Sequence, residues 1–468
     1  MTPTPEQPIA KQTLYSILAA GLLSFMGILV ETSMNVTFPT LMKTMHVNLT
    51  TIQWITTGYL LVVTMMMISS AHLLKRYPAK NLFLFAISCF TLGSIIAACA
   101  TSFPMLMGAR VIQALSTGIS TPLLFHIILT QIPRTKIGTY NGMAAMIISL
   151  APALGPTYGG LLTASFTWRE IFWWLMPLIV IVFLIGVTHL ELPASDPQDR
   201  FDGWGFVLFA AFLMVVDFAF DQAGKHGFTS LIFWGYLLVG AILAGVLVSY
   251  NRHSKVHLLD LKIFRNLIVD WHLLAYFLLQ FINIGSSFVL PNVAQLVLGH
   301  NAFVAGLMLL PGALLGACLA PVAGRLMDRV GAYRPILSGV TAMVVGCLAF
   351  VISHSWLTVT LIGGFYIVTR VGFAFAFGNT ITNASKQVTM RQKADINAAF
   401  NMSQQYAGSL GTGVLAAIIG AFQLQPGTTA VTTARGAQVD YWVLLIFAVV
   451  ALLSILNSRR ISKESRNA

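Results

Sequence analysis

The sequence predicts an all-α membrane protein with fourteen transmembrane helices, arranged as two six-helix bundles with a two-helix hairpin inserted between them. Three observations predict this fold class. The 468 residues are 57% hydrophobic and only 9% charged, and their mean hydropathy is +0.80. Apolar runs of about 20 residues, the length that crosses a bilayer as a helix, recur along the chain. Short polar or basic stretches separate these runs.

The predicted spans form groups of six, two and six. Polar sequence (ELPASDPQDRFDG) follows the sixth span and basic sequence (NRHSKVHLLDLKIFRN) follows the eighth, so we expect domains at residues 1–196, 197–255 and 256–468. This order fits transporters built from repeated bundles, with a substrate site near the midplane, although fourteen independent helices in a scaffold would give the same hydropathy. The spans are expected at residues 14–37, 52–74, 82–100, 105–132, 137–162, 171–190, 204–221, 231–250, 271–298, 303–327, 336–352, 357–384, 394–422 and 441–456.

Positive charge is unevenly divided between alternate connections. One side carries most of the lysines and arginines, whereas the other carries only Lys43, Arg169, Lys225 and Arg435. Because short cytoplasmic loops are enriched in lysine and arginine, we expect both termini in the cytoplasm. This distribution also accounts for the formal net charge of +12 without nucleic acid as a partner.

The first predicted span contains a carboxylate, Glu31, in an otherwise apolar stretch. A lone acid inside a membrane is costly and marks a site that handles protons or ions. At 1.5 Å per residue Glu31 lies about 23–26 Å above the cytoplasmic surface, and Arg110 about 9 Å below the outer one, so they share a depth in a core of about 30 Å. Burial favours the neutral acid and a nearby guanidinium favours the carboxylate, a balance suited to proton exchange. A static ion pair that joins two helices is the alternative.

Several motifs carry a resemblance to a known family. APALGPTYGG, at 151–160, resembles the Gly-Pro-x-x-Gly-Gly signature of proton-coupled antiporters in the major facilitator superfamily. Its proline removes a backbone donor, and its glycines allow a kink and close helix approach, although the bare string also fits a packing kink. The residues concerned are Gly155, Pro156, Gly159 and Gly160.

Further motifs follow the order of that superfamily. GRLMDRVG at 324–331 resembles its cytoplasmic loop signature, and Arg110 with Gln113 resembles the Arg-x-x-Gln signature of its fourth helix. Glu31 with Asn35 and Pro39 resembles the acidic stretch that ends the first helix in drug:proton antiporters, and WREIF at 168–172 opens the sixth span as in that family. By resemblance the chain is identified as a member of the fourteen-span drug:proton antiporter family, which implies the major facilitator fold.

The first-half copy of the loop signature departs from the family. It has Lys75 where the family has aspartate and Pro78 where the family has glycine. We hypothesise a charge swap in which Lys75 pairs with Asp395 to close the cytoplasmic side; two solvated charges at helix ends would fit equally well, because exposed pairs contribute little. The resemblance implies a cytoplasmic gate formed by Lys75, Arg76, Asp328, Arg329 and Asp395.

The inserted hairpin carries two acids, Asp217 and Asp221, spaced i, i+4 on one helix face. They are candidates for a second proton site or for attraction of a cation. In the resembled fold, however, the inserted pair lies outside the transport core. We therefore expect Asp221 to be a boundary residue and leave the role of Asp217 open.

Polar and aromatic side chains at middle depths are candidates for the wall of a substrate cavity. Interhelical hydrogen bonds are the alternative for each amide, and aromatic and methionine side chains also suit a cavity that accepts many lipophilic cations. The candidates are Asn35, Trp54, Tyr59, Gln113, Gln280, Asn283, Arg370 and Gln404.

Other kinds of chemistry have little support in the sequence. The four cysteines, Cys89, Cys99, Cys318 and Cys347, lie in apolar runs without metal-ligand or redox spacing, so we expect buried apolar side chains. The polar N-terminal tail has no cleavage site, so the first helix is expected to stay. No nucleotide-binding fingerprint occurs. We expect no enzyme activity, cofactor or metal, and transport driven by an ion gradient.

The resulting expectation is a proton-coupled antiporter in a bacterial cytoplasmic membrane. It would export lipophilic, often cationic, compounds by alternating access, with Glu31 as principal proton site. Its expected partners are protons, small-molecule substrates and membrane lipids, without nucleic acid, and we expect a monomer. The alternatives are an exporter of the same fold for a native metabolite, lipid or siderophore, and a non-transporting scaffold or sensor.

Overall fold

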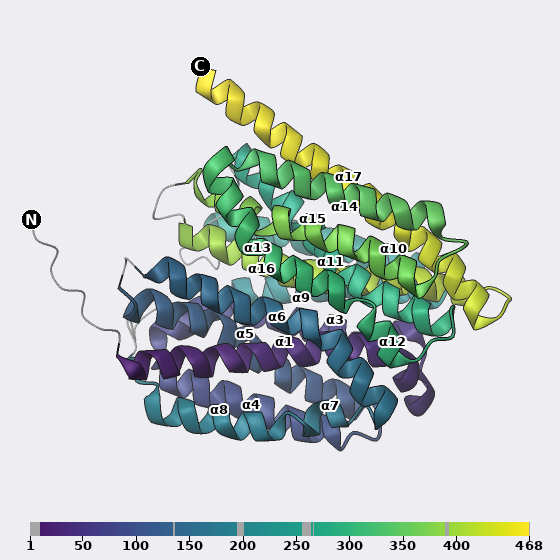
Figure 1. Ribbon diagram of the computed structural model, residues 1–468, viewed down its shortest axis with the longest axis horizontal. Coiled ribbons are helices and arrows are strands. Elements are labelled where there is room, and N and C mark those ends of the chain that lie inside the picture. Colours follow the sequence, from purple (N-terminus) through teal and green to yellow (C-terminus); the bar gives the residue numbers. More distant parts are fainter. Residues whose placement is uncertain are drawn as a thin grey trace, which may run out of the picture.

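The computed structural model describes residues 10–133, 136–193, 201–254, 264, 266–388 and 393–467, without the side chains of residues 71, 138, 393–395 and 465–467. These residues form helices and short connections, with no strand among them. Fourteen of the helical segments are long and apolar enough to cross a membrane, so the predicted number of spans is confirmed. The long helices run side by side, and the first helix begins at the end of the molecule where the last helix ends (Figure 1). We call this end the termini side and the opposite end the far side.

The first bundle consists of six spans, two of which are divided by a break in the helix. The second span is divided near Gln53 and the sixth near Trp174, in both cases close to the far side. The helices are α1 (Lys11–Met45), α2 (Leu49–Ile52), α3 (Trp54–Arg76), α4 (Ala79–Ala98), α5 (Phe103–Gln131), α6 (Ile137–Ser165), α7 (Glu170–Trp173) and α8 (Met176–His189).

The hairpin and the second bundle follow in the predicted order. The first span of the hairpin packs on both bundles. The second span of the hairpin packs mainly on the first hairpin span, and it is the least buried of the fourteen spans. The helices are α9 (Gly203–His226) and α10 (Leu231–His253), then α11 (Leu267–Leu296), α12 (Ala302–Leu307), α13 (Leu310–Val330), α14 (Tyr333–Ser353), α15 (Val359–Ser385), α16 (Lys393–Gln423) and α17 (Thr429–Asn467).

The last span differs most from its predicted bounds. We expected it to begin at residue 441, but α17 begins at Thr429. The added turns contain arginine, glycine and threonine and have low hydropathy, but they pack closely against α16. A Cβ on Gly436 would lie 2.7 Å from the Cα of Ile419. Tertiary packing, which a hydropathy pattern does not contain, therefore extends this helix.

The two bundles meet at the far side. There, the rings of Phe38 on α1 and Phe288 on α11 lie 5.7 Å apart, and Gln295 donates to the Val36 carbonyl at 2.8 Å. In Figure 1 the purple and blue helices of the first bundle lie below the green and yellow helices of the second. Helices α6 and α12 form a second seam, and α3 and α16 form a third.

Candidate transport site

Glu31 is buried in α1, with 4% of its surface exposed, and Arg110 is fully buried in α5. Their charges are close enough to influence each other. Among the described residues, however, the two form no direct ion pair and Glu31 has no hydrogen-bond partner. Arg110 donates instead to the Ile55 carbonyl at 3.0 Å and to Gln113 Oε1 at 2.9 Å. Glu31 and Arg110 are therefore close to each other without direct contact.

A hydrogen-bonded network holds Arg110 in place. Its Cζ lies 3.9 Å from the centre of the Tyr59 ring, and the Tyr59 hydroxyl contacts the Thr117 hydroxyl at 2.6 Å and the Gly27 carbonyl at 3.1 Å. Gln113 donates onward to Ser94 at 2.8 Å. Tyr59 and Gln113, which we expected in a cavity wall, are both fully buried. They position the guanidinium, and their polar atoms are occupied within the first bundle.

The glycine motif of α6 packs beside Glu31. A Cβ on Gly155 would overlap the Thr32 side chain, and a Cβ on Gly159 would overlap the backbone of Ser33. The Ser33 hydroxyl donates to the Gly155 carbonyl at 2.9 Å. These contacts require helices α1 and α6 to approach at backbone distance immediately after the carboxylate, as small residues permit.

The same motif also closes the α6–α12 seam at the far side. A Cβ on Gly160 would overlap the Ala302 carbonyl, and a Cβ on Gly306 would overlap the Pro156 carbonyl. The motif therefore faces α1 with two glycines and the second bundle with Pro156 and Gly160.

Asp217 occupies the α3–α16 seam, so the expectation that the hairpin lies outside the core needs correction. Only 2% of Asp217 is exposed, and its Oδ2 accepts a hydrogen bond from Ser409 of α16 at 2.9 Å. The same Ser409 hydroxyl lies 3.0 Å from the carbonyl of Thr57 in α3. Asp217 Oδ1 is buried without a partner. Helix α9 packs on both α16 and α3, and the Asp217 carboxyl reaches Ser409 in the seam between them.

Asp221 ties the hairpin to the first bundle. It accepts hydrogen bonds from the indole of Trp54 at 2.8 Å and from Lys225 at 2.8 Å. The Trp54 ring also lies 4.8 Å from that of Phe218. Trp54, which we expected to line a substrate cavity, therefore contacts α9.

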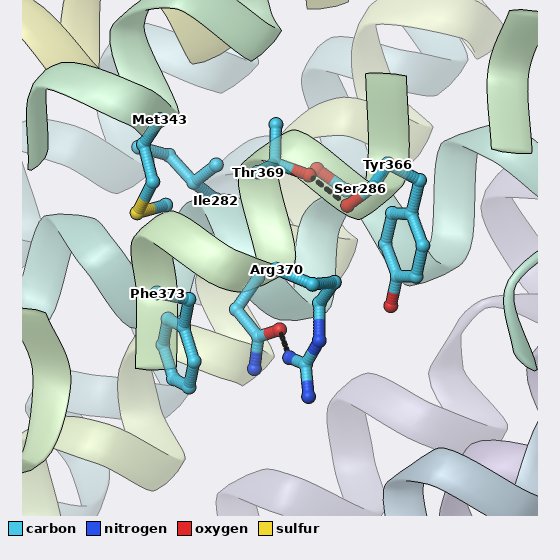
Figure 2. Close-up of a pocket in the computed structure, with 8 residues that line it drawn as sticks. Ile282, Ser286, Met343, Tyr366, Thr369, Arg370 and Phe373 are labelled. Atoms are coloured by element: carbon cyan, nitrogen blue, oxygen red, sulfur yellow. Dashed lines mark hydrogen bonds between the residues drawn. The ribbon is translucent and has the colours of Figure 1, made fainter. Parts of the chain in front are cut away.

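The second bundle has its own buried cation, Arg370 of α15. Its Nη1 donates to Asn283 Oδ1 of α11, and Asn283 donates onward to Gln280 at 3.3 Å. Arg370 Nε is buried without a partner. Figure 2 shows Arg370 together with the other side chains that line a small cavity. The lining residues are Ile282, Asn283, Ser286, Met343, Tyr366, Thr369, Arg370 and Phe373.

The remaining predicted cavity residues form helix-to-helix bonds. Gln404 accepts a hydrogen bond from the Tyr276 hydroxyl at 2.9 Å, and Asn35 accepts one from Thr56 at 2.8 Å. Of the amides proposed for the cavity, the structure therefore places Asn283 at the lining and gives Gln404 and Asn35 packing contacts within one bundle.

The predicted gate lies on the termini side. Lys75 and Arg76 end α3, and Asp328 and Arg329 are exposed near the end of α13. The side chain of Asp395 lies outside the described residues, so its pairing with Lys75 stays a prediction.

The structure also corrects and extends the sequence reading. Cys99 and Cys318 are exposed, so the expectation of buried cysteines is wrong for them: an apolar span can face lipid. Asp440 was missed because it precedes the predicted last span. It is fully buried in α17, and neither of its oxygens has a partner. Ser409 and Thr57 were missed because hydroxyl residues in a membrane helix give little sequence signal.

Comparison with known proteins places the fold and its relatives. The sequence matches the Major Facilitator Superfamily profile over residues 20–412. It is 31% identical over 457 residues to the lincomycin resistance protein LmrB of Listeria monocytogenes, covering 95% of this chain and 96% of that protein. It is 30% identical to LmrB of Bacillus subtilis, covering 96% of each chain. It is 27% identical to the multidrug resistance protein Stp of Mycobacterium tuberculosis, covering 87% of this chain and 76% of Stp.

Solved structures share the fold at lower identity. A bacterial homolog of the human lysosomal transporter Spinster, inward-facing and unoccupied, has a TM-score of 0.67 at 16% identity, covering 97% of this chain and 98% of that one. A peptide transporter POT in complex with sulfate has a TM-score of 0.68 at 14% identity, covering 96% and 94%. The chain therefore belongs to the major facilitator superfamily of secondary transporters, which are not enzymes, and is related within it to the drug-resistance proteins LmrB and Stp.

Proposed function

We propose that this transporter exports lipophilic, often cationic, small molecules in exchange for protons, with Glu31 as the principal proton site. The observation that carries the proposal is the surroundings of Glu31. Its carboxyl is buried, it feels the charge of Arg110, and yet no ion pair fixes it, because Arg110 is held by Ile55, Gln113 and Tyr59. A carboxyl held in this way can gain and lose a proton without dismantling the helix packing.

The far-side seams supply the alternating access that such exchange needs. We propose that the far side faces out of the cell, with both termini in the cytoplasm, as the lysine and arginine distribution indicates. In the described state α6 closes on α1 and α12 immediately after Glu31. Opening this seam would connect Glu31 to the outside, where a proton binds and the drug leaves. Closing it would carry the proton inward.

Asp217 is proposed as a second proton site. The Ser409 hydroxyl has one hydrogen but lies within bonding distance of two oxygens, the Asp217 carboxyl and the Thr57 carbonyl. A carbonyl can only accept. If Asp217 carries a proton, it donates to Ser409, which donates to Thr57, and both contacts become hydrogen bonds. The geometry therefore favours a protonated Asp217 when the α3–α16 seam is closed.

The substrate range is inferred from relatives and from the site. LmrB and Stp are named for resistance to lincomycin and to multiple drugs, respectively, and a buried acid attracts organic cations. We propose a monomer whose partners are protons, small-molecule substrates and membrane lipids, with domains at residues 1–196, 197–255 and 256–468. The gate on the termini side, including the Lys75–Asp395 swap, is proposed as the opposing closure.

Proton flux in everted membrane vesicles tests the proposal. Addition of a transported compound should release protons from vesicles that contain the wild-type protein, and Glu31→Gln should abolish this response. Drug-dependent flux that persists in Glu31→Gln would refute the role of Glu31. The absence of flux with any compound would refute proton-coupled drug export.

A further inference from the structure

Arg370 lacks a counterion within the described second bundle. It is the one lysine or arginine of that bundle that is buried among the described residues, with 8% of its surface exposed. Asp440, the buried carboxyl of the same bundle, has no partner on either oxygen and so does not neutralise it. A guanidinium offers five donors, and the side-chain acceptor that Arg370 contacts here is the neutral amide of Asn283. A buried cation in this setting is costly unless an anion pairs with it.

The cavity at Arg370 contains no acid that would compete for the guanidinium. Its lining is mostly apolar, the Thr369 hydroxyl donates to the Tyr366 carbonyl at 2.8 Å, and the Phe373 ring lies 5.1 Å from the guanidinium carbon. In Figure 2 the guanidinium and the Tyr366 phenol both point away from the Thr369 side chain. The cavity is small, far below the roughly 300–1,000 Å³ of a drug pocket, so in this state it has room for no more than a small terminal group of a ligand.

Helix register brings this cation level with Glu31. Phe38, which contacts Phe288 of α11, lies seven residues after Glu31, and Val36, which contacts Gln295 of α11, lies five residues after Glu31. Counting back equally along α11, which runs in the same direction as α1, Glu31 is level with the stretch 281–290. Asn283, the partner of Arg370, falls in this stretch. Glu31 of the first bundle and Arg370 of the second therefore lie at comparable heights along these helices, and their charges have opposite signs.

We propose that Arg370 binds a carboxylate group of the transported molecule, so that the substrates include amphipathic acids and zwitterions. The planar guanidinium accommodates a carboxylate through two parallel hydrogen bonds, using the unpaired Nε and a terminal nitrogen. A zwitterion would present its amine to Glu31 and its carboxylate to Arg370. The proposal rests on the proposed function only in treating this cavity as part of the transport path.

Two matched ligand pairs test the site in the purified full-length protein, without a proton gradient. Tetramethylrhodamine and its methyl ester differ only in a free carboxylate, and their binding is read by fluorescence anisotropy. Benzoate and benzamide differ in the same charge, and their effect is read as a shift in thermal unfolding. Wild-type protein should bind the free acid about tenfold tighter than the ester, which corresponds to one carboxylate-specific interaction of ordinary strength, and benzoate but not benzamide should raise its unfolding temperature.

Three variants make the result decisive. Arg370→Gln should erase both preferences, and Asn283→Asp should do the same by supplying an internal carboxylate while keeping the arginine. Arg435→Gln, at an exposed arginine of α17, should behave as wild type. Equal binding of acid and ester together with no benzoate effect in wild type, or preferences that survive both Arg370→Gln and Asn283→Asp, would overturn the proposal. Glu31→Gln should keep the acid preference, which separates this test from that of proton coupling.

Discussion

The two bundles each bury one arginine, but in opposite circumstances. Arg110 of the first bundle is sealed from solvent, donates to Ile55 and Gln113 and lies against the Tyr59 ring. Arg370 of the second bundle contacts one amide and borders a cavity. Each guanidinium keeps one buried nitrogen without a partner, Nη2 in Arg110 and Nε in Arg370. The difference therefore lies in what surrounds them: Arg110 is enclosed by its hydrogen-bond partners and the Tyr59 ring, whereas Arg370 borders a cavity.

The largest effect in this comparison is expected at Glu31, the acid that lies near Arg110. Glu31→Gln keeps the shape of the side chain and removes its titration, so drug-dependent proton flux in everted vesicles should fall by at least about 100-fold, equivalent to about 2.7 kcal/mol of coupling. Glu191→Gln makes the same change at an exposed acid and should leave the flux unchanged. Proton flux at the wild-type level in Glu31→Gln would mean that Glu31 and Arg110 have only a structural role.

The hairpin acid gives the next largest effect. Asp217→Asn should leave transport active but remove one proton from each cycle, so the steady-state drug gradient should lose the driving force of one proton, about 2.3 kcal/mol per 100 mV. Drug accumulation measured against an imposed pH gradient should then rise less steeply with that gradient than in wild type.

Ser409→Ala provides the contrast for Asp217→Asn. It removes the hydroxyl that links Asp217 to the Thr57 carbonyl but leaves the acid in place. The slope of drug accumulation against the imposed pH gradient should therefore stay nearer to the wild-type slope in Ser409→Ala than in Asp217→Asn. Identical steepness in wild type and Asp217→Asn would exclude Asp217 from proton coupling.

Much of the fold could be predicted from the sequence because its signal is local. Span number follows from apolar runs, and the fourteen predicted spans are all present. The start of α17 could not be predicted in this way, since the turns from Thr429 to Asp440 are held by packing on α16 rather than by hydropathy.

The site could be predicted only in part, for a related reason. Residue type and depth singled out Glu31, Arg110 and Asp217, but whether a polar group faces a cavity or a neighbouring helix depends on long-range register. Tyr59 and Trp54 illustrate this limit: both have the chemistry of a cavity wall, yet one holds Arg110 and the other contacts Asp221. Ser409 is the reverse case, an ordinary serine that register alone places between Asp217 and Thr57.

The seam beside Glu31 gives a third, smaller effect. Gly159→Ala places a Cβ against the Ser33 backbone, which cannot rotate away as a side chain could, so helices α1 and α6 must separate. Overpacking of this kind destabilises by about 2 kcal/mol, and we expect a lower unfolding temperature together with weaker transport. Gly142→Ala lies in the same helix with open space around it and should change neither. Equal unfolding temperatures for both variants would show that the close approach is not required.

The smallest expected effects come from removing one tyrosine hydroxyl in each bundle and comparing the two losses of stability. Tyr59→Phe keeps the ring over Arg110 but leaves the buried Gly27 carbonyl and Thr117 hydroxyl without their partner, which should lower the free energy of unfolding by about 1 kcal/mol. Tyr366→Phe removes a hydroxyl whose contact, Ser287 at 3.4 Å, is long, and should cost less. Denaturant unfolding in detergent measures both variants. A larger loss for Tyr366→Phe than for Tyr59→Phe would contradict the contrast, because it would mean that the second bundle depends on this polar contact for packing at least as much as the first bundle depends on Tyr59.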